Sequence, residues 1–500
     1  MAVRNSGLLL HISSLPGDEG IGTMGKEAFH FVDFLQETGQ TLWQILPIGP
    51  TGFGNSPYMC YSAFAGNPLL IDLKLLVDDN FLTENDFPGI PKFPARRIDF
   101  QKVIPWKFTI LRKAFEKFRL EIPEKIKGEY AQFLKEHTWW LKDFALFMAL
   151  KQHFGDQQWS DWEPDLKFRK KRILNEFTKL LSDEIDFQKF VQFVFFRQWF
   201  GLKEYANAKG IKIFGDMPLY VSGDSTDVWT NASIFNLDEN LKPLEVGGVP
   251  PDYFSKTGQL WGNPVFNWEM LEQRKFDWWL ARLHFNINLF DIVRIDHFRG
   301  LESFWSVPAG EKTAINGTWR PAKGFRMLAE FKHQVGHLPL AAEDLGVITP
   351  EVEQLRDEFE LPGMKVLQFA FSSDAQNEHL PHNYLPKFIA YTGTHDNDTF
   401  LGWMCSLKGR ERKMVSRYLG RPGKRALKKG IEQIWASSAG SAVIPMQDVL
   451  QLGAKARLNI PGVANGNWEW RFTWRQLKAR HRRFLAKITR KYNRQKSAIE

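Results

Sequence analysis

The sequence predicts an α/β protein built on a (β/α)8 TIM barrel, with large, mostly helical insertions between barrel strands. Eight short apolar runs bounded by Gly, Pro or Asp occur along the 500 residues, and such runs are typical of strands buried on both faces of a parallel sheet. Amphipathic helical stretches lie between several of these runs, which indicates a parallel α/β fold. Eight strands favour a closed barrel over an open sheet.

The predicted strands are spread over most of the chain. In order, they are residues 7–13, 41–46, 211–216, 290–296, 338–343, 364–371, 388–394 and 442–449. Helical periodicity predicts helices over residues 26–39 after the first strand, 273–285 before the fourth and 349–360 after the fifth. We therefore assign residues 1–500 to a single catalytic barrel domain.

Two long insertions interrupt the regular alternation. About 160 residues separate the second and third strands, and residues 75–205 show helical patterns at 106–118, 131–154 and 187–208. We interpret this stretch as a helical insertion after the second strand. Residues 222–268, after the third strand, have irregular composition. Loops that follow barrel strands line the face where barrel enzymes place their sites, so we expect this second insertion to cover the active site.

The composition is that of a globular protein. Apolar residues make up 43% and charged residues 25% of the chain, which excludes general disorder. The 19 Trp and 42 Phe are unusual; most are expected in the core, although an enzyme that stacks sugar rings also exposes aromatic side chains. Composition alone does not separate these two uses.

The net charge of +9 is concentrated near the C-terminus, where residues 475–496 contain no Asp or Glu. Apolar residues recur there at helical spacing and predict a docked terminal helix with a solvated basic face; they are Trp470, Trp474, Leu477, Phe484 and Ile488. A nucleic-acid-binding arm is the alternative, but no recognition motif supports it.

The two cysteines, Cys60 and Cys405, form neither a disulfide framework nor a CxxC metal pattern. A reducing compartment is therefore favoured, and we expect a cytoplasmic protein. The apolar run at residues 8–10 is too short for a signal peptide, and no uncharged apolar stretch reaches the roughly 18 residues that a membrane-spanning helix needs.

Three of the predicted strands end in acidic residues. Asp296 ends the fourth strand, Glu343 ends the fifth, and Asp396 follows the seventh. One acid after a strand is ordinary, because it can cap the next helix. Three acids at three strand ends of one barrel predict convergence at the mouth, because all the C-terminal strand ends share one face.

The surroundings of these acids suggest different protonation states. Arg294 and Asp296 are two residues apart on a strand and point to the same side, so the cation should keep Asp296 ionised, as a nucleophile must be; a plain ion pair is the alternative. Glu343 would face the negative Asp296 and Asp396, which should raise its pKa and suit it to general acid catalysis. A charged and a protonated carboxyl are the equipment of glycoside cleavage, and retaining enzymes hold them about 5–5.5 Å apart.

Two further acids have other expected roles. Asp216, at the end of the third strand, could bind sugar hydroxyls or help to hold the barrel mouth, and the sequence favours neither. Asp344 directly follows Glu343 and should point elsewhere, so we interpret it as structural.

The runs around the three acids are Arg-Ile-Asp-His-Phe-Arg-Gly from Arg294, Ala-Glu-Asp-Leu-Gly from Ala342 and Gly-Thr-His-Asp-Asn-Asp from Gly393. They resemble the active-site runs of the 4-α-glucanotransferases (amylomaltases or disproportionating enzymes), which form glycoside hydrolase family 77 in the α-amylase clan. Supporting runs are His-Ile-Ser-Ser-Leu-Pro-Gly, Asn-Ser-Pro-Tyr, Gly-Asp-Met-Pro, Pro-Pro-Asp-Tyr-Phe, Leu-Trp-Gly-Asn-Pro and Gly-Asn-Trp. The match runs in order from about residue 6 to 475, and the ordered set is highly specific.

The resemblance implies an enzyme that transfers an α-1,4-glucan segment from a donor to the 4-OH of an acceptor by a retaining double displacement. Asp296 would be the nucleophile, Glu343 the acid/base and Asp396 the transition-state stabiliser. The implied contacts to the donor sugar are Tyr58, Asp216, Arg294, His395 and Asn467, and the implied residues of the loop over the bound glucan are Tyr253, Phe254 and Trp261.

The resemblance also implies the partners. Malto-oligosaccharides, amylose or glycogen-derived glucans would be donors, and glucose or another glucan would accept the transferred segment. The scheme needs no cofactor and no metal, and it involves no nucleic acid and no membrane.

Several other motifs are weaker than they look. Residues 20–25 fit GxGxxG, but they lie well past the first strand and the next strand ends without the acid that a dinucleotide site needs. His333 and His337 have zinc-protease spacing, but Gln334 replaces the glutamate. Ser13 and Ser14 lack a GxSxG elbow.

The functional alternatives are an α-glucan hydrolase of the same clan, a non-catalytic glucan-binding barrel and a basic nucleic-acid binder. Product analysis separates the first, because hydrolysis raises the number of reducing ends and disproportionation does not. Loss of a carboxylate would have favoured the second, and the third would show salt-dependent retention on nucleic acid.

Overall fold

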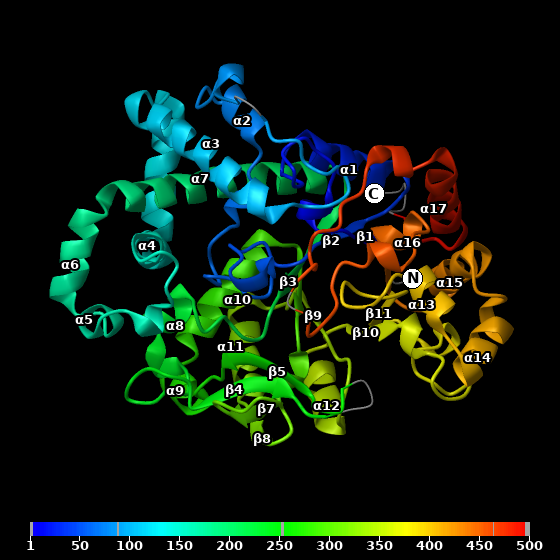
Figure 1. The fold of residues 1–500 in the computed structure, drawn as a ribbon. Coiled ribbons are helices and arrows are strands. Elements are labelled where there is room, and N and C mark those ends of the chain that lie inside the picture. The colour runs from blue at the N-terminus through cyan, green and yellow to red at the C-terminus, as the bar shows by residue number, and fades with distance from the viewer. Residues whose placement is uncertain (1–3, 88–89, 252–254, 464, 496–500) are drawn as a thin grey trace.

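Eight parallel strands form the centre of the molecule (Figure 1). The computed structural model describes residues 4–87, 90–251, 255–463 and 465–495. The strands are hydrogen-bonded in the order β10-β11-β12-β1-β2-β3-β6-β9, and each overlaps a predicted strand, so the predicted eight-stranded barrel is confirmed. Their bounds are β1 (Asn5–Leu9), β2 (Leu42–Gln44), β3 (Lys212–Met217), β6 (Ile292–Ile295), β9 (Leu340–Ala342), β10 (Gly363–Val366), β11 (Phe388–Tyr391) and β12 (Ser441–Pro445).

The barrel closes between β9 and β10 through a side chain as well as the backbone. The Ala342 N–H donates to the carbonyl of Pro362 at 2.9 Å, and the Met364 N–H donates to Asp344 Oδ1 at 2.6 Å. A Cβ at Gly363 would lie 2.3 Å from Asp344 Oδ2, so this close approach requires glycine. These contacts agree with the structural role predicted for Asp344.

Alternate residues of the strands fill the barrel, as the period of two requires. The inward-facing cluster consists of Leu9, Leu42, Phe214, Ala341, Met364, Val366, Ile389, Tyr391 and Val443. The residues next to them in sequence, such as Leu8, Ile213 and Val293, pack outward against helices. Near the mouth this alternation puts Asp216 and Arg294 on the inner side, two residues beyond Phe214 and Ile292.

Helices surround the barrel and connect its strands (Figure 1). Three of the predicted helices are present with shifted ends: residues 26–39 as α1, 273–285 as α10 and 349–360 as α12. One helix follows β1: α1 (Lys26–Glu37). The helices directly before β3, β6, β9 and β10 are, in that order, α7 (Ser182–Ala208), α10 (Asp277–Leu289), α11 (Gly324–Val335) and α12 (Pro350–Glu358). Three helices precede β12: α13 (Phe400–Ser406), α14 (Gly409–Leu419) and α15 (Lys424–Ala436).

The residues between β2 and β3 contain a group of helices beside the barrel (Figure 1). They are α2 (Leu73–Asp78), α3 (Phe100–Leu120), α4 (Glu124–His153), α5 (Pro164–Lys167) and α6 (Lys171–Leu180), followed by α7. Aromatic rings hold them together: Phe118 of α3 lies 4.7 Å from Phe190 of α7, and Phe133 of α4 lies 5.7 Å from Phe193 of α7. Much of the phenylalanine content is therefore core packing.

A second, antiparallel sheet is the main departure from the prediction. Residues 222–268 were expected to be irregular, but they contain α8 (Thr226–Thr230), β4 (Glu245–Val249) and β5 (Gln259–Pro264), with α9 starting at the end (Trp268–Gln273). These strands pair with β7 (Ser303–Pro308) and β8 (Thr318–Pro321), which follow β6, in the order β5-β4-β7-β8. The sheet joins two barrel loops distant in sequence, and local composition does not encode such pairing.

Three predicted ends also differ. The strand predicted at 364–371 ends at Val366 and the one predicted at 442–449 ends at Pro445, where α16 (Met446–Val449) begins. The terminal helix predicted from Trp470 starts later, as α17 (Ala479–Lys491). In each case apolar residues beyond the observed end of the strand or helix are also buried, which the sequence pattern does not distinguish. Among the described residues, no helix is long and apolar enough to cross a membrane.

Candidate active site

Asp296 and Glu343 lie side by side at the mouth of the barrel. Strands β6 and β9 are parallel neighbours, and their last paired residues are Ile295 and Ala342. Asp296 and Glu343 are the next residues on each strand, and the Glu343 N–H donates to the Ile295 carbonyl at 3.1 Å. Because neighbouring strands lie about 4.8 Å apart, this register makes the two acidic residues neighbours at the barrel mouth.

Arg294 connects Asp296 to a second buried carboxylate. It pairs in register with Asp216 of β3, and its Nη1 donates to Asp216 Oδ1 at 2.8 Å and Oδ2 at 2.7 Å. Its Nη2 donates to Asp296 Oδ1 at 2.7 Å. Burial lowers the pKa of Arg294, but the Asp216 and Asp296 carboxylates outweigh it and raise that pKa well above its ordinary value. The guanidinium is therefore a permanent positive charge beside Asp296.

Asp216 is held from two sides. Burial raises its pKa and Arg294 opposes that rise, while the Tyr58 hydroxyl donates to Asp216 Oδ2 at 2.7 Å. The Asp216 side chain is fully buried in this pair with Arg294. These contacts help to hold the barrel mouth, and the predicted sugar contact of Asp216 stays a prediction.

Glu343 is protonated at neutral pH, and burial is the main reason. Desolvation raises its pKa to about 8, with Asp296 adding to the rise and Arg294 opposing it. The predicted contribution of a negative neighbour is present through Asp296, but burial is the larger cause of the rise. The carboxyl accepts hydrogen bonds from the backbone N–H of His297 at 2.8 Å and of Leu345 at 3.3 Å.

His297 reaches Glu343 because of its backbone conformation. Its φ of 52° lies in the left-handed region, which non-glycine residues seldom adopt and which often marks a functional site. This turn directs its N–H away from β6 and toward Glu343. The residue after the candidate nucleophile thus orients the candidate acid.

Asp396 stays ionised by a different arrangement. Burial disfavours its charged form, but His395 and the Asn459 amide outweigh burial and hold its pKa at about 2. His395 Nε2 lies 3.3 Å from Asp396 Oδ1, and Asn459 Nδ2 donates to the same oxygen at 2.6 Å. Burial lowers the pKa of His395, yet Asp396 reverses this effect and raises it.

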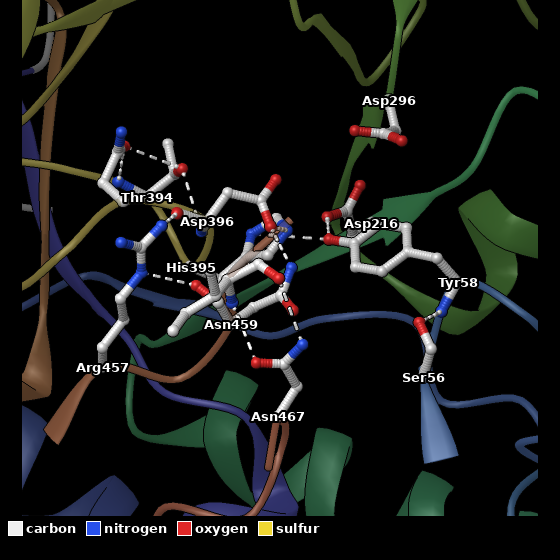
Figure 2. A network of polar contacts seen from close by, with 12 residues as sticks. Ser56, Tyr58, Asp216, Asp296, Thr394, His395, Asp396, Arg457, Asn459 and Asn467 are labelled. Atoms are coloured by element: carbon white, nitrogen blue, oxygen red, sulfur yellow. Dashed lines mark hydrogen bonds and ion pairs between the residues drawn. The ribbon is translucent and has the colours of Figure 1, made fainter. Parts of the chain in front are cut away.

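Tyr58 connects Asp216 with His395 (Figure 2). Its ring stacks on His395 with centroids 5.0 Å apart, and its hydroxyl lies between Asp216 and His395 Nδ1, which is 3.5 Å away. Both Asp296 and Asp396 act electrostatically on this hydroxyl. The three acids predicted from strand ends therefore belong to one connected polar site.

Comparison with known proteins agrees with this geometry. A family model described as 4-alpha-glucanotransferase matches residues 10–477. The chain belongs to the 4-alpha-glucanotransferase family. It is 48% identical over 495 residues to the 4-alpha-glucanotransferase of Synechocystis sp., covering 98% of both chains. It is 47% identical over 487 residues to the one from Thermus thermophilus, covering 96% of both.

A solved structure supports the same assignment. The amylomaltase from Streptococcus agalactiae in complex with acarbose matches with a TM-score of 0.95 and 40% sequence identity, covering 99% of this chain and 100% of that chain. As a member of the 4-alpha-glucanotransferase family, the chain is an enzyme of this type, and the alternative of a hydrolase from the same clan is not favoured.

Two further predicted sugar contacts of the transferase, Trp261 and Asn467, lie outside the barrel strands. Trp261, on β5 of the antiparallel sheet, lies edge-on to the ring of His297 with centroids 4.7 Å apart, so that sheet reaches the residue that follows Asp296. Asn467 bonds within its own loop, to the Ile460 N–H at 2.9 Å and the Val463 carbonyl at 2.7 Å. Tyr253 and Phe254 lie outside the described residues, and the sugar contacts of all four remain predictions.

Sequence reasoning missed three residues that hold the transferase site. His297 was passed over because it follows Asp296 without a pattern of its own. Asn459 bonds the Asp396 carboxylate, and Arg457 Nη2 donates to the Asp396 carbonyl at 2.6 Å. Both lie in an irregular segment after β12, where no strand end or motif points to the mouth.

Proposed function

We propose that this transferase moves α-1,4-linked glucan segments by double displacement, with Asp296 as nucleophile, Glu343 as acid/base and Asp396 as stabiliser of the transition state. The observation that carries this assignment is the division of protonation states at one barrel mouth. Glu343 has a pKa of about 8, Asp396 has a pKa of about 2, and Asp296 contacts the guanidinium of Arg294.

The first half-reaction breaks the donor glycosidic bond. Glu343 gives its proton to the glycosidic oxygen as the bond from C1 to that oxygen breaks, and Asp296 forms a bond to C1. Asp296 Oδ1 accepts from Arg294, and no hydrogen bond from the described residues holds Oδ2, so Oδ2 is the attacking atom. The products are a β-linked glycosyl ester on Asp296 and a free glucan with a new 4-OH.

The second half-reaction reverses the roles. The acceptor 4-OH attacks C1, the ester bond to Asp296 breaks, and Glu343, now a carboxylate, takes the hydroxyl proton. Two inversions restore the α configuration. Asp396, fixed by His395 and Asn459, holds the ring hydroxyls as positive charge develops at C1, so its contribution is larger in the transition state than in the ground state.

Malto-oligosaccharides, amylose or glycogen-derived glucans are the proposed donors, and glucose or another glucan is the proposed acceptor. The relative from Streptococcus agalactiae binds acarbose, which supports the donor class. Transfer requires that an acceptor sugar outcompetes water. Trp261 beside His297, with Tyr253 and Phe254 of the same insertion, is our candidate for that preference. Cys60 and Cys405 are free thiols, which supports a reducing compartment such as the cytoplasm.

The nucleophile assignment is tested with Asp296→Asn on maltotriose. We expect formation of glucose and longer maltodextrins to fall by about 10³-fold or more, because the amide cannot form the ester. Asp291→Asn is the matched control, since Asp291 lies just before β6 at the opposite end of the barrel, where substitutions affect stability rather than chemistry. A parent-like rate in Asp296→Asn would refute the assignment, and a rise in reducing ends with the unaltered enzyme would indicate hydrolysis.

A further inference from the structure

The loop that carries His395 and Asp396 is tied at both ends to one buried carboxyl group. The Thr392 hydroxyl, just after β11, donates to Asp448 Oδ2 at 2.6 Å. The Phe400 N–H, at the start of α13, donates to Asp448 Oδ1 at 2.8 Å. His395 and Asp396 lie between these two bonds, so Asp448 fixes both points from which their loop departs.

Asp448 takes no part in the proposed chemistry, and its position is energetically unfavourable for a charged group. It lies on α16 directly after β12 and has no exposed surface. Among the described residues, no lysine, arginine or histidine forms an ion pair with it. Burial raises its pKa to about 7, the Thr392 and Phe400 hydrogen bonds oppose the rise, and Asp398 adds to it. Burying a carboxyl group without a cation costs free energy. The hydrogen bonds from Thr392 and Phe400 offset part of this cost.

Hydrogen bonds also hold the loop between the two bonds to Asp448. The Thr394 N–H and hydroxyl both donate to Asn397 Oδ1, at 2.8 and 3.0 Å, and Gln368 Nε2 donates to the Asp398 carbonyl at 2.8 Å. A shift of either end therefore moves the loop as a unit and carries Asp396 with it.

The far side of Asp396 is braced by the same stretch of chain. Asn459 bonds its carboxylate and Arg457 its carbonyl (Figure 2), and Arg457 Nε donates to the Asn459 carbonyl at 2.7 Å. The segment after β12 thus contacts the loop at its base through Asp448 and at its tip through Asn459. Displacing the base separates Asp396 from the amide at the tip.

From this geometry we propose that Asp448 is a positioning residue for glucan transfer, which acts by fixing both ends of the loop that presents His395 and Asp396. The inference rests on the role proposed for Asp396. Asp448 does not touch the substrate; it sets where the stabilising carboxylate stands, and a displacement of about 1 Å at such a group costs about 10²-fold in rate.

The experiment compares two substitutions at this position. Asp448→Leu fills the space but accepts neither hydrogen bond, and we expect kcat to fall about 10- to 100-fold with KM nearly unchanged, because Asp396 acts mainly in the transition state. Asp448→Asn can rescue the rate: its oxygen accepts from Phe400 and its amide donates to the Thr392 hydroxyl, which can also accept. Thr392→Val, which removes one tie only, gives an intermediate loss and remains informative if Asp448→Leu does not fold.

A double-mutant cycle separates this role from a general loss of structure. In the Asp396→Asn background, Asp448→Leu should cause little further loss of kcat, because the residue through which it acts is already disabled. A full additional loss in that background, or parent-like kcat in folded Asp448→Leu and Thr392→Val, overturns the proposal. If Asp396→Asn itself keeps the parent rate, the proposed role of Asp396 fails, and that result is visible without any substitution at Asp448.

Discussion

Raising the pH above about 8 should inactivate the enzyme by removing the proton that Glu343 donates to the leaving glucan. Burial raises the pKa of Glu343 to about 8, whereas Asp396, with a pKa of about 2, stays ionised throughout the working range. We therefore expect kcat/KM to fall along an alkaline limb with a pKa near 8, since kcat/KM reports the essential groups of the free enzyme.

The size of the pKa rise at Glu343 helps to identify its cause. The difference between the ordinary pKa of 4.5 and about 8 corresponds to about 5 kcal/mol against the charged form. A unit negative charge about 6 Å away contributes about 3 kcal/mol at an effective dielectric constant of about 20. Asp296 supplies such a charge, but Arg294 opposes it with the opposite sign. Arg294 has the larger effect of the two, so desolvation remains as the cause of the raised pKa.

The assay is a pH–rate profile for disproportionation of maltotriose at low and high salt. A pKa set by burial should move by less than about half a unit between about 0.05 M and 0.5 M salt. A pKa shift caused by partly exposed charges should become smaller, because the Debye length shortens as salt is added. α-Glucosyl fluoride is the control donor, because fluoride leaves without a proton and its glycosylation step should lack the limb. A limb below about pH 6.5, or one that moves a full unit with salt, refutes the burial argument.

The raised pKa of Glu343 also makes the free energy of unfolding depend on pH. Because the pKa of Glu343 is higher in the folded than in the unfolded state, its stabilising contribution is complete below about pH 4.5 and is lost as the pH rises through about 8. Between pH 6 and 9 this loss amounts to about 3 kcal/mol. Glu343→Gln cannot ionise, so its free energy of unfolding in urea should fall less than that of the parent over this interval, while its transfer rate falls by about 10²- to 10⁴-fold.

Three other substitutions test the supports of the site and the barrel. Arg294→Lys keeps the charge but cannot bridge two carboxylates, so kcat/KM for maltotriose should fall about 100-fold; a loss below threefold would contradict the bridging role. Arg494→Ala removes a buried guanidinium that donates to five backbone carbonyls and should lower the free energy of unfolding by about 3–5 kcal/mol, whereas exposed Arg490→Ala should change it by less than about 0.5 kcal/mol. Gly363→Ala puts a methyl group 2.3 Å from a carboxylate oxygen and should cost about 1–3 kcal/mol in the same urea assay; an unchanged midpoint would show that β9 and β10 can move apart.

Much of the barrel could be predicted because parallel strands leave a strong local signal. Strands buried on both faces appear as short apolar runs, and each of the eight runs overlaps an observed strand. The acids follow from the same rule, since C-terminal strand ends share one face. Asp296 and Glu343 were therefore placed on one edge by counting along the chain, and their register next to Ile295 and Ala342 agrees.

The rest depends on contacts between distant segments. Nothing in residues 222–268 indicates that β4 will pair with β7, because the partner lies beyond another barrel strand. Asn459 lies 63 residues from Asp396, in a segment without regular structure. The cause of the raised Glu343 pKa was also out of reach, since neighbouring charges can be counted in a sequence, whereas desolvation depends on how completely the folded chain surrounds the carboxyl group.

The three carboxyl groups of the site have three different surroundings. Burial keeps Glu343 protonated, a buried guanidinium faces Asp296, and a histidine with an amide keeps Asp396 ionised. The partners of Asp296 and Asp396 come from different parts of the barrel: Arg294 from the inner face of β6, His395 from the loop after β11, and Asn459 from the segment after β12. A substitution that shifts one loop should therefore alter one carboxyl group and leave the other two in their states. Loss of Asp448, at the base of the β11 loop, should thus lower the rate while the alkaline limb of Glu343 stays near pH 8, and an accompanying shift of that limb would show that the three environments are not independent.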